Sequence, residues 1–506
     1  MARRSKAQTS GGSDTTRPVL PVIAAAVLIL LSLLILATSG SRTASQDTFS
    51  LQGSPLGPAG LSVPAVNAVG GSSSWYCVWP ESAKFSGASG EIVIANVTTT
   101  KSVVRLFKSE GVAGAHRAVR IPANSVVRVP MSEFSTSSGG GGVSILSSGG
   151  QIAVGMSLTT AEGGVLSPCQ SSPGFYWVIQ GGSTLAGSTL KVAIFNPFPN
   201  PSVLDVRLLA PSGSTDLGSL QGIIVPSGQT SVLDIGKLYA GHRFVIVEIR
   251  ARAGRVVASG LVETSTSTLV GANLLVGVNR PSPDWYFPQL FNSIGITSQL
   301  LIFNPSSSPV RANVKVLPAQ GRMAGIVGIG VGGSKFSQVV EPESMSVIDL
   351  TSFTSLPSSS GYGISVTDSG NGLVVSSQLT EAVTGKVGRE ISELGTSVPA
   401  ADWLVVHLAP SEPVGFSVMN ATNQNLQGTF QSGSISDLTV NPAPAGKASK
   451  ADLPITVLRD EVLLQNIGSL GPSAVRISLE GKAVVVPVAG AGLEFLQNVM
   501  SFPFRG

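Results

Sequence analysis

The sequence is poor in charged residues. Only 12% of its 506 residues are Asp, Glu, Lys or Arg, against a usual share of about 25%. The formal net charge is +4, and residues 1–17 hold four bases and one acid, so +3 lies there and the other 489 residues carry +1. These five residues are Arg3, Arg4, Lys6, Arg17 and Asp14. A body this neutral lacks the positive surface that binds a phosphate backbone, which argues against nucleic acid as a partner.

Residues that usually perform catalysis are also scarce. The chain has three histidines, His116, His242 and His407, far apart in the sequence. We find no pattern of a serine hydrolase, a zinc protease or a phosphate-binding loop. The glycine run 139–142 has no following helix or lysine, so we expect a flexible hairpin or loop there. The sequence therefore predicts no catalytic residue, no cofactor and no metal site, and we do not expect an enzyme.

One long apolar run lies near the N-terminus. Residues 19–38 contain no charge, and twenty residues at about 1.5 Å each cross about 30 Å of hydrocarbon. The run predicts a single transmembrane helix in the lipid bilayer of the cell membrane. Basic residues precede it, which places the tail 1–18 in the cytoplasm and the body outside. A cleaved secretory signal is the alternative, and it exports the body as well.

The chain has only two cysteines, Cys77 and Cys169. Export places both in an oxidising compartment, so we expect them to form a disulfide. A metal pair or a reactive thiol is the alternative, but neither cysteine has a histidine close by in the sequence. Residues 39–72, which precede Cys77, mix small polar residues with Gly and Pro, and this composition is typical of a stalk.

The remainder of the chain repeats itself. All five tryptophans fall at the starts of four segments, which read WYCVWP, FYWVIQ, DWYFPQL and DWLVVHL. Each segment continues with an apolar stretch that ends in asparagine. These asparagines are Asn96, Asn196, Asn304 and Asn420, and Pro197 and Pro305 follow the middle two. A phrase that recurs about every hundred residues indicates a domain present in four copies.

Each copy holds about seven short strands, in which β-branched residues alternate with polar ones and Gly, Pro, Asn or Ser mark the turns. This pattern predicts an all-β fold of tandem immunoglobulin-like β-sandwich repeats. A β-propeller built of half-repeats is the alternative, because a blade uses about 45 residues. The expected domains are 73–160, 175–264, 284–381 and a divergent copy at 402–491, followed by a C-terminal tail at 492–506.

The recurrent polar residues are interpreted as structural. An Asn at a strand end can bond its own backbone two residues on, and a following Pro fixes the direction of the turn. We therefore expect a turn-forming role for the four asparagines and the two prolines. Asn96 and Asn420 also stand in glycosylation acceptor sequences. Asp234 and Asp349 recur in the same way, and we expect them to cap turns.

The aromatic residues at the repeat starts are the candidates for a binding surface, because Trp and Tyr stack on sugar rings and anchor interfaces. These candidates are Trp75, Tyr76, Tyr176, Trp177, Trp285, Tyr286 and Trp403. The alternative is that each Trp fills the core of its own copy or the seam with the previous one.

Residues 195–258, which include FNPFPNPSVLDVRLLAPSG, and the WYC and DWYFP segments resemble the actinobacterial envelope proteins grouped as domain-of-unknown-function family 5719. The resemblance extends over roughly residues 70–490. It implies a membrane-anchored or secreted protein without an assigned activity, and it transfers no catalytic residue.

These observations predict a non-enzymatic, membrane-anchored extracytoplasmic protein of the bacterial cell envelope. We expect a structural or adhesion-type rod that contacts cell-wall glycan or an envelope membrane protein. The alternative is an accessory subunit of a membrane glycosyltransferase or of an envelope polysaccharide assembly system.

Overall fold

The computed structural model describes residues 60–64 and 72–489, with internal gaps of which the longest are 320–334 and 438–452. These residues belong to one compact unit, Asp47–Gly506, and their regular secondary structure is almost entirely β-strand, which confirms the all-β prediction. The predicted tail 1–18, the transmembrane helix 19–38 and the C-terminal tail 492–506 lie outside the described residues. In the part that is described, no helix has both the length and the hydropathy of a membrane span.

The second copy shows the plan of a repeat. Its strands are β11 (Tyr176–Gly182), β12 (Ser188–Phe195), β13 (Ser202–Ala210), β14 (Gly213–Thr215), β15 (Ile223–Val225), β16 (Thr230–Asp234), β17 (Val245–Ala253), β18 (Val257–Ser265) and β19 (Leu269–Val276). They form two sheets. The first sheet has the order β11-β17-β13, with β14 and β15 on the outer edge, and the second has the order β16-β12-β18-β19. We call this copy repeat 2.

Repeat 1 follows the same plan. Its strands are β2 (Ser72–Pro80), β3 (Ser89–Asn96), β4 (Ser102–Phe107), β5 (Arg117–Ile121), β6 (Ser125–Pro130), β7 (Ser135–Thr136), β8 (Gly140–Ser148), β9 (Ile152–Thr160) and β10 (Gly163–Pro168). The first sheet has the order β2-β8-β4-β5, with β7 beside β8, and the second has the order β10-β9-β3-β6.

Repeat 3 keeps the four principal strands of each sheet in the same order. Its strands are β20 (Asp284–Leu290), β21 (Ile296–Asn304), β22 (Val310–Pro318), β23 (Lys335–Val340), β24 (Ser344–Asp349), β25 (Tyr362–Thr367), β26 (Val374–Glu381) and β27 (Gly388–Leu394). The orders are β20-β25-β22-β23 and β27-β26-β21-β24.

Repeat 4 contains β28 (Ala400–His407), β29 (Val414–Asn420), β30 (Leu426–Ser434), β31 (Ser436–Asp437), β32 (Leu453–Val457), β33 (Val462–Gly468) and β34 (Ser473–Ala489). Apart from β31, these strands belong to one sheet of seven strands, in which the first part of β34 pairs with β28 and β30 and its last part pairs with β29.

The repeats are longer than the sequence predicted, and their strand order is different. Strands β10, β19 and β27 lie after the predicted domain ends at 160, 264 and 381, in segments expected to be linkers. In an immunoglobulin sandwich the first two strands pair in one sheet. Here the first two strands of repeats 1, 2 and 3 lie in different sheets, so the immunoglobulin type of the repeat is not confirmed.

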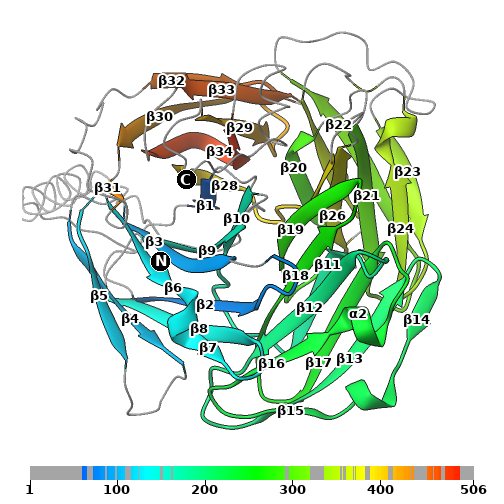
Figure 1. Cartoon of the computed structure of the whole chain (residues 1–506). Helices are drawn as coiled ribbons and strands as arrows, with labels where there is room; N and C mark the ends of the chain where they lie inside the picture. The colour runs from blue at the N-terminus through cyan, green and yellow to red at the C-terminus, as the bar shows by residue number, and fades with distance from the viewer. Residues whose placement is uncertain are drawn as a thin grey trace, which may run out of the picture. The chain divides into compact units, whose positions relative to one another are not determined.

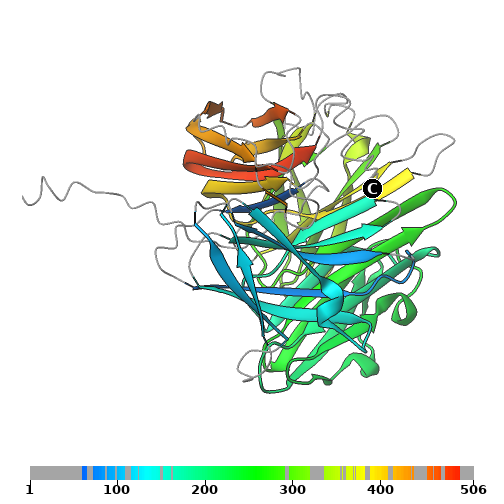
Figure 2. The ribbon, with the colours of Figure 1, turned by 60° about the vertical axis from the view of Figure 1, so that its left-hand side comes forward.

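Strands of different repeats also pair with each other (Figure 1). Strand β19 of repeat 2 pairs in parallel with β27 of repeat 3, so their second sheets form one continuous sheet of eight strands. Strand β31 of repeat 4 pairs in parallel with β6 of repeat 1. Strand β1 (Gly60–Pro64), which lies within the predicted stalk, pairs antiparallel with β28 (Figure 2). The stalk prediction is therefore wrong for these five residues, because they complete a sheet of repeat 4.

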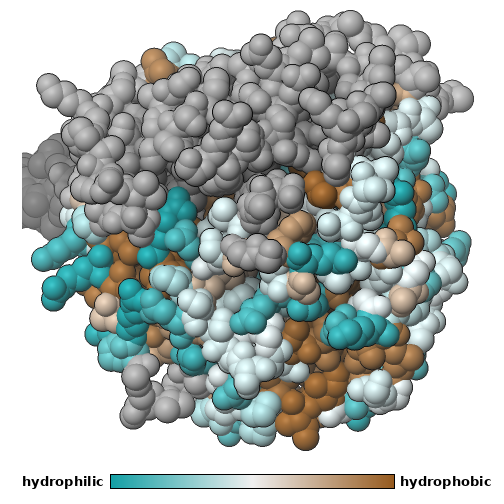
Figure 3. Space-filling view, in the orientation of Figure 1, coloured by the Kyte–Doolittle hydropathy of each residue, from teal (hydrophilic) through white to brown (hydrophobic). Residues whose placement is uncertain are grey.

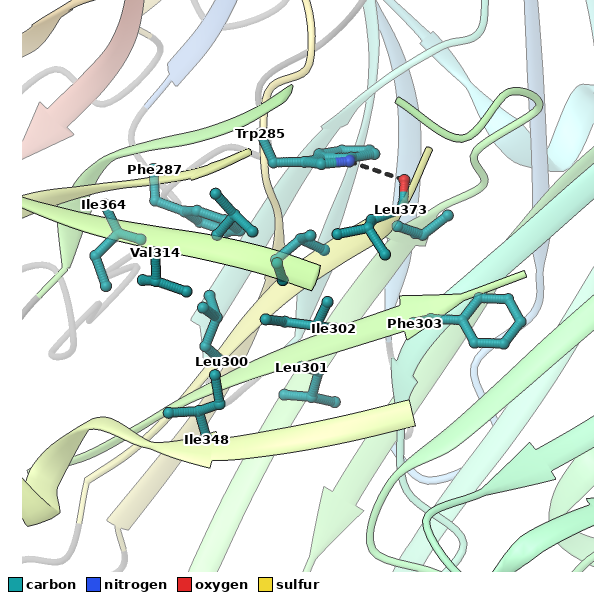
Figure 4. Packing of buried hydrophobic residues seen from close by; sticks show 14 of the residues in the cluster. Trp285, Phe287, Leu300, Leu301, Ile302, Phe303, Val314, Ile348, Ile364 and Leu373 are labelled. Carbon is teal, nitrogen blue, oxygen red and sulfur yellow. Dashed lines mark hydrogen bonds between the residues drawn. The ribbon is translucent and has the colours of Figure 1, made fainter. Parts of the chain in front are cut away.

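The apolar side chains of repeats 1 to 3 pack between the two sheets of a repeat and also across the seams between repeats. In repeat 3 the core includes Trp285, Phe287 and Leu300 (Figure 4). Tyr76 and Val78 of β2 face the other way and join the cluster of repeat 2. Alternation along a strand places neighbouring side chains on opposite faces, so β2 is buried on both sides.

The cysteines form the predicted disulfide. The Sγ atoms of Cys77 and Cys169 lie 2.00 Å apart, and the bond ties the first strand of repeat 1 to the segment after β10. Repeat 3 fills the corresponding place with Phe287 and Gly395. A Cβ atom on Gly395 would lie 2.7 Å from the Phe287 ring, so the ring occupies the space. One location thus holds a covalent bond in one repeat and an aromatic contact in another.

Candidate functional site

The tryptophans that mark the repeats are buried. Trp75, Trp177, Trp285 and Trp403 are all at most 1% exposed. The indole Nε1 of Trp177 donates to the Val256 carbonyl oxygen at 2.8 Å, and that of Trp285 donates to the Leu373 carbonyl oxygen at 2.8 Å (Figure 4). These rings therefore do not supply an exposed binding surface. Each Trp instead fills the core of its own repeat, which was the alternative to a binding surface.

The neighbouring tyrosines pack at the seams between repeats. Tyr76 is 5% exposed and belongs to the cluster of repeat 2. Tyr176 packs against the cluster of repeat 3, and Tyr286 packs against that of repeat 4. Burial, followed by the nearby carboxylate of Asp284, raises the pKa of Tyr286 to about 12. The prediction of an aromatic binding surface is wrong for these residues too, because their rings join consecutive repeats.

The recurrent asparagines form the predicted turns and also make a second set of contacts. The Oδ1 atom of Asn196 accepts from the Phe198 amide at 3.0 Å, and Asn304 does the same for Ser306 at 2.9 Å. Their Nδ2 atoms donate to the carbonyl oxygens of Asn200 at 2.7 Å and Ser308 at 2.8 Å.

The second set of contacts crosses between the two sheets of a repeat. The Nδ2 atom of Asn196 also donates to Val225, on the outer edge of the first sheet, at 3.0 Å. Asn96, Asn304 and Asn420 make the same kind of bond to Ile121, Val340 and Val457. All four asparagines are at most 4% exposed. In repeats 1, 2 and 3 the asparagine therefore clamps the turn after the second strand to the other sheet, and in repeat 4 Asn420 clamps it to β32 of the same sheet.

These contacts also bear on the two glycosylation acceptor sequences. The side-chain nitrogens of Asn96 and Asn420 are buried and donate to backbone carbonyls. A glycan on a buried amide nitrogen would displace those bonds. Pro197 and Pro305 directly follow two of the clamps, in the turns that the clamps close.

The two recurrent aspartates cap short helical turns, as predicted. Asp234 Oδ1 accepts from the Lys237 amide at 3.2 Å at the start of α2 (Ile235–Leu238). Asp349 Oδ1 accepts from the Thr351 amide at 3.0 Å at the start of a 3₁₀ turn, Leu350–Ser352.

The three histidines lie in three different repeats. His116 tilts against Phe107 with ring centroids 5.5 Å apart, and His242 stacks on Tyr239 at 3.9 Å. His407 is the last residue of β28. No group of three or more His, Cys, Asp or Glu side chains that could hold a metal ion occurs among the residues that the structure describes.

The glycine run forms part of a strand rather than a flexible loop. Gly140 is the first residue of β8, and a Cβ atom on Gly142 would lie 2.4 Å from the Phe195 ring of repeat 2. Gly140 and Gly141 pair with Thr136 and Ser135 of β7, so the run lies in a hairpin, which is one of the two predicted forms, and the loop form is wrong. The missing side chains let the ring of one repeat approach the backbone of the next.

A network of charged residues lies on the first sheet of repeat 2. Glu248 of β17 is 1% exposed, and its carboxylate accepts from the Tyr176 hydroxyl at 2.8 Å. It also accepts from Arg207 Nε at 2.8 Å and from Arg250 Nη2 at 2.7 Å. Burial raises the pKa of Tyr176, and the charge of Glu248 raises it further, so the phenol stays protonated and donates. A buried polar group needs hydrogen-bond partners, and Glu248 has three donors.

The same network crosses the seam to repeat 3. Arg207 Nη1 lies 2.7 Å from Glu343 Oε2, in the turn before β24. Glu343 is the one non-glycine residue with positive φ in the described part of the chain, at 50°, and repeat 2 has Gly228 at φ 65° in the matching turn. A left-handed residue other than Gly costs about 1–2 kcal/mol. The ion pair with Arg207 offers a reason for a glutamate, rather than a glycine, at this left-handed position.

A second polar layer lies where β19 and β27 pair. Glu390 of β27 is 8% exposed, and burial raises the pKa of its carboxyl group. It accepts hydrogen bonds from Thr264 Oγ1 at 3.1 Å and from the Gln378 amide. Ser392 Oγ donates to the Gly181 carbonyl oxygen across the seam at 3.0 Å. Burial also raises the pKa of Glu393, on the same strand, to about 7.

The two layers join repeats 2 and 3. Sequence reasoning missed both layers. Glu248 and Arg207 stand 41 residues apart in the chain, and Arg207 and Glu343 stand 136 apart. One signal was available, since a Glu in β17 has an apolar residue on either side. A charge in an otherwise apolar strand indicates a buried partner.

Comparison with known proteins adds one finding. Residues 147–288 match a family of unknown function, DUF5719. The match covers repeat 2 and its borders, a smaller part than the resemblance over 70–490 implied. No curated protein matches the chain.

Two solved structures show a weak likeness. A glycoside hydrolase family 32 protein from Bifidobacterium adolescentis has 8% identity and a TM-score of 0.12, with 83% of this chain and 100% of that one covered. A Streptomyces avermitilis alpha-L-rhamnosidase complexed with L-rhamnose has 8% identity and a TM-score of 0.10, with 87% and 57% covered. Scores this low carry no argument about fold or function.

Proposed function

We propose that the protein is a non-enzymatic, membrane-anchored extracytoplasmic scaffold of the bacterial cell envelope that binds cell-wall glycan or an envelope protein. The observation that carries this proposal is that every repeat is fastened to its neighbours by backbone pairing or by buried polar contacts. Such a body presents surfaces in fixed positions, which suits binding.

Buried contacts between the repeats distinguish this scaffold from a rod of separate modules. Gln180 Nε2 of repeat 2 donates to the Leu301 carbonyl oxygen of repeat 3 at 2.9 Å. Ser417 Oγ of repeat 4 donates to the Pro288 carbonyl oxygen of repeat 3 at 2.9 Å. Buried polar contacts hold one geometry because an unpaired partner costs about 1–3 kcal/mol. The scaffold we propose is therefore rigid.

The strand orders support the propeller of half-repeats as the architecture of this scaffold. A propeller blade has four strands, and blades stack face to face. Repeats 1 and 3 each divide into two sheets with four principal strands. Tyr76 and Val78 show that sheets of different repeats pack together. Strand β1, from the beginning of the described chain, completes a sheet of the last repeat.

The disulfide supports an extracytoplasmic body. Disulfides persist in oxidising compartments and are rare in the cytosol, and the Cys77–Cys169 bond is buried in repeat 1. The apolar run 19–38 supplies the proposed anchor.

Binding to the wall can be tested with the full chain in a neutral nanodisc. We expect it to sediment with insoluble cell-wall material and to remain soluble without it. A protein that stays in the supernatant contradicts the glycan part of the proposal. In vivo cross-linking followed by mass spectrometry tests the protein partner. Recovery of a membrane glycosyltransferase at stoichiometric yield would favour the accessory-subunit function instead.

The location can be tested separately. We expect protease added to intact spheroplasts to digest the body and to leave residues 1–38 protected. Protection of the whole chain would contradict the extracytoplasmic orientation.

A further inference from the structure

The hairpin formed by β4 and β5 in repeat 1 concentrates the charge of the molecule. Residues 101–120 contain five bases and one acid, so they carry +4, which equals the net charge of the whole chain. The bases are Lys101, Arg105, Lys108, Arg117 and Arg120, and the acid is Glu110. The other 486 residues therefore sum to zero.

The two faces of this hairpin differ sharply. Val104, Leu106, Val119 and Ile121 point into the core of repeat 1. Alternation along a strand places the intervening side chains on the opposite face. Arg105, Ala118 and Arg120 are exposed there, and Val103 and Phe107 are half-buried.

The register makes the two arginines neighbours. Val103 pairs with Arg120, and Arg105 pairs with Ala118. Arg105 and Arg120 are therefore diagonal neighbours on one face, a separation of about 7–8 Å. The rings of Phe107 and His116 lie at one end of the face, with centroids 5.5 Å apart. The face thus combines two cations with an aromatic edge.

Neither arginine has an anionic partner in the described part of the chain. The nearby carboxylates bind other arginines, since Glu133 pairs with Arg117 and Glu91 pairs with Arg128. Like charges placed side by side on a sheet are destabilising. An anion bound between them would remove this repulsion. Figure 3 shows hydrophilic and hydrophobic residues intermixed on the side of the molecule where β4 and β5 lie.

We propose that this face binds an acidic polysaccharide, that is, a sugar chain with carboxylate or phosphate groups. Arg105 and Arg120 bind the anionic groups, because a guanidinium forms charge-assisted hydrogen bonds to carboxylate and phosphate. Phe107 and His116 contact a sugar ring. The inference rests on the proposed function, because it specifies which glycan of the envelope the scaffold binds.

The apolar residues favour a polysaccharide over a membrane surface. A membrane-surface element inserts large apolar side chains into the bilayer. The large hydrophobic side chains that are exposed in the described part of the chain all lie outside repeat 1, and they are Phe175, Leu185, Ile224, Leu238, Val339, Val398 and Leu453. The described residues of the cationic hairpin supply none to insert.

The test uses the full chain in a neutral nanodisc, with polygalacturonate as the acidic polymer and dextran as the neutral one. We expect binding to polygalacturonate that weakens as salt is raised, and no binding to dextran. The double variant Arg105→Gln/Arg120→Gln should bind about tenfold more weakly. The matched control is Arg311→Gln/Lys335→Gln, which removes two exposed cations from the corresponding hairpin of repeat 3.

In the polymer-binding assay, three outcomes would overturn the inference: no binding of polygalacturonate, equal binding of dextran, or equal loss in both double variants. Binding to phosphatidylglycerol vesicles without binding to polygalacturonate would assign the face to a membrane. The single variants Arg105→Gln and Arg120→Gln test each cation if the double variant does not fold. Retention of wild-type wall sedimentation by the double variant would reject this inference and leave the proposed function standing.

Discussion

Repeats 1 and 2 place different residues at the same position of the same strand. Nine residues after the clamp asparagine stands Arg105 in repeat 1 and Asp205 in repeat 2, and two residues further stand Phe107 and Arg207. In repeat 2 the acid and the bases neutralise one another, and Arg207 reaches repeat 3. In repeat 1 the same face stays exposed and cationic. The buried positions thus maintain the repeat, and the outward positions determine what each repeat contacts.

Removing the disulfide should cause the largest loss of stability, because repeat 1 has a covalent bond where repeat 3 has a ring contact. The bond closes a loop with a sequence separation of 92. The chain-entropy account predicts that Cys77→Ala/Cys169→Ala lowers the free energy of unfolding by about 4 kcal/mol. Denaturant unfolding measures the loss. An unchanged midpoint would mean that packing alone holds repeat 1.

Disrupting the charge network of repeat 2 should cause the second largest loss in the free energy of unfolding. Arg207→Ala leaves Glu248 buried with fewer donors, and we expect a loss of about 3 kcal/mol. Glu343→Gly removes the ion pair but also the left-handed conformation of a non-glycine residue. It should therefore cost less than about 1 kcal/mol. A larger loss for Glu343→Gly than for Arg207→Ala would contradict this account of the seam.

Replacing the clamp asparagine with alanine should lower the free energy of unfolding by the same amount in repeats 1 and 2. Asn196→Ala removes bonds to Asn200, Val225 and Phe198, and we expect a loss of about 2 kcal/mol. Asn96→Ala should cost about the same. Asn313→Ala, at an exposed position of β22, is the control and should be nearly neutral. Unequal losses of stability would show that the clamp asparagine does not have the same role in repeats 1 and 2.

The smallest expected effect concerns Asp205, which corresponds to Arg105. The hydrogen bond from Arg252 lowers the pKa of the Asp205 carboxyl group. A lowered folded-state pKa gives stability that is present above the unfolded-state value and is lost as pH falls through the folded-state value. Asp205→Asn should therefore reduce the acid sensitivity of unfolding below about pH 4. Thermal melts of both proteins from pH 2 to 7 test this, and parallel curves would exclude a role for Asp205.

The sequence predicted the buried parts of this protein well. A Trp near each repeat start, an Asn at each strand end and two lone cysteines gave the fourfold plan, the turns and the disulfide. The sheet order was harder, because most consecutive strands of a repeat lie in different sheets. Alternation along a strand shows which face is buried, but it does not show which strand is the neighbour.

The sequence misassigned the aromatic residues. Trp and Tyr suit both a core and a binding surface. The choice depends on whether another sheet covers the ring, and that sheet comes from a segment far away in the chain. Tyr76 illustrates this, since its cover belongs to repeat 2.

The sequence by itself therefore determined the repeated β-strand plan, the clamp asparagines and the disulfide, because these depend on local pattern and composition. Only the tertiary structure decided which strands pair between repeats, that the aromatic residues are buried, and that Arg207 is neutralised while Arg105 stays exposed. The physical reason is that burial and neutralisation depend on partners that are distant in sequence. Arg207 and Glu343 lie 136 residues apart in the chain and 2.7 Å apart in the fold.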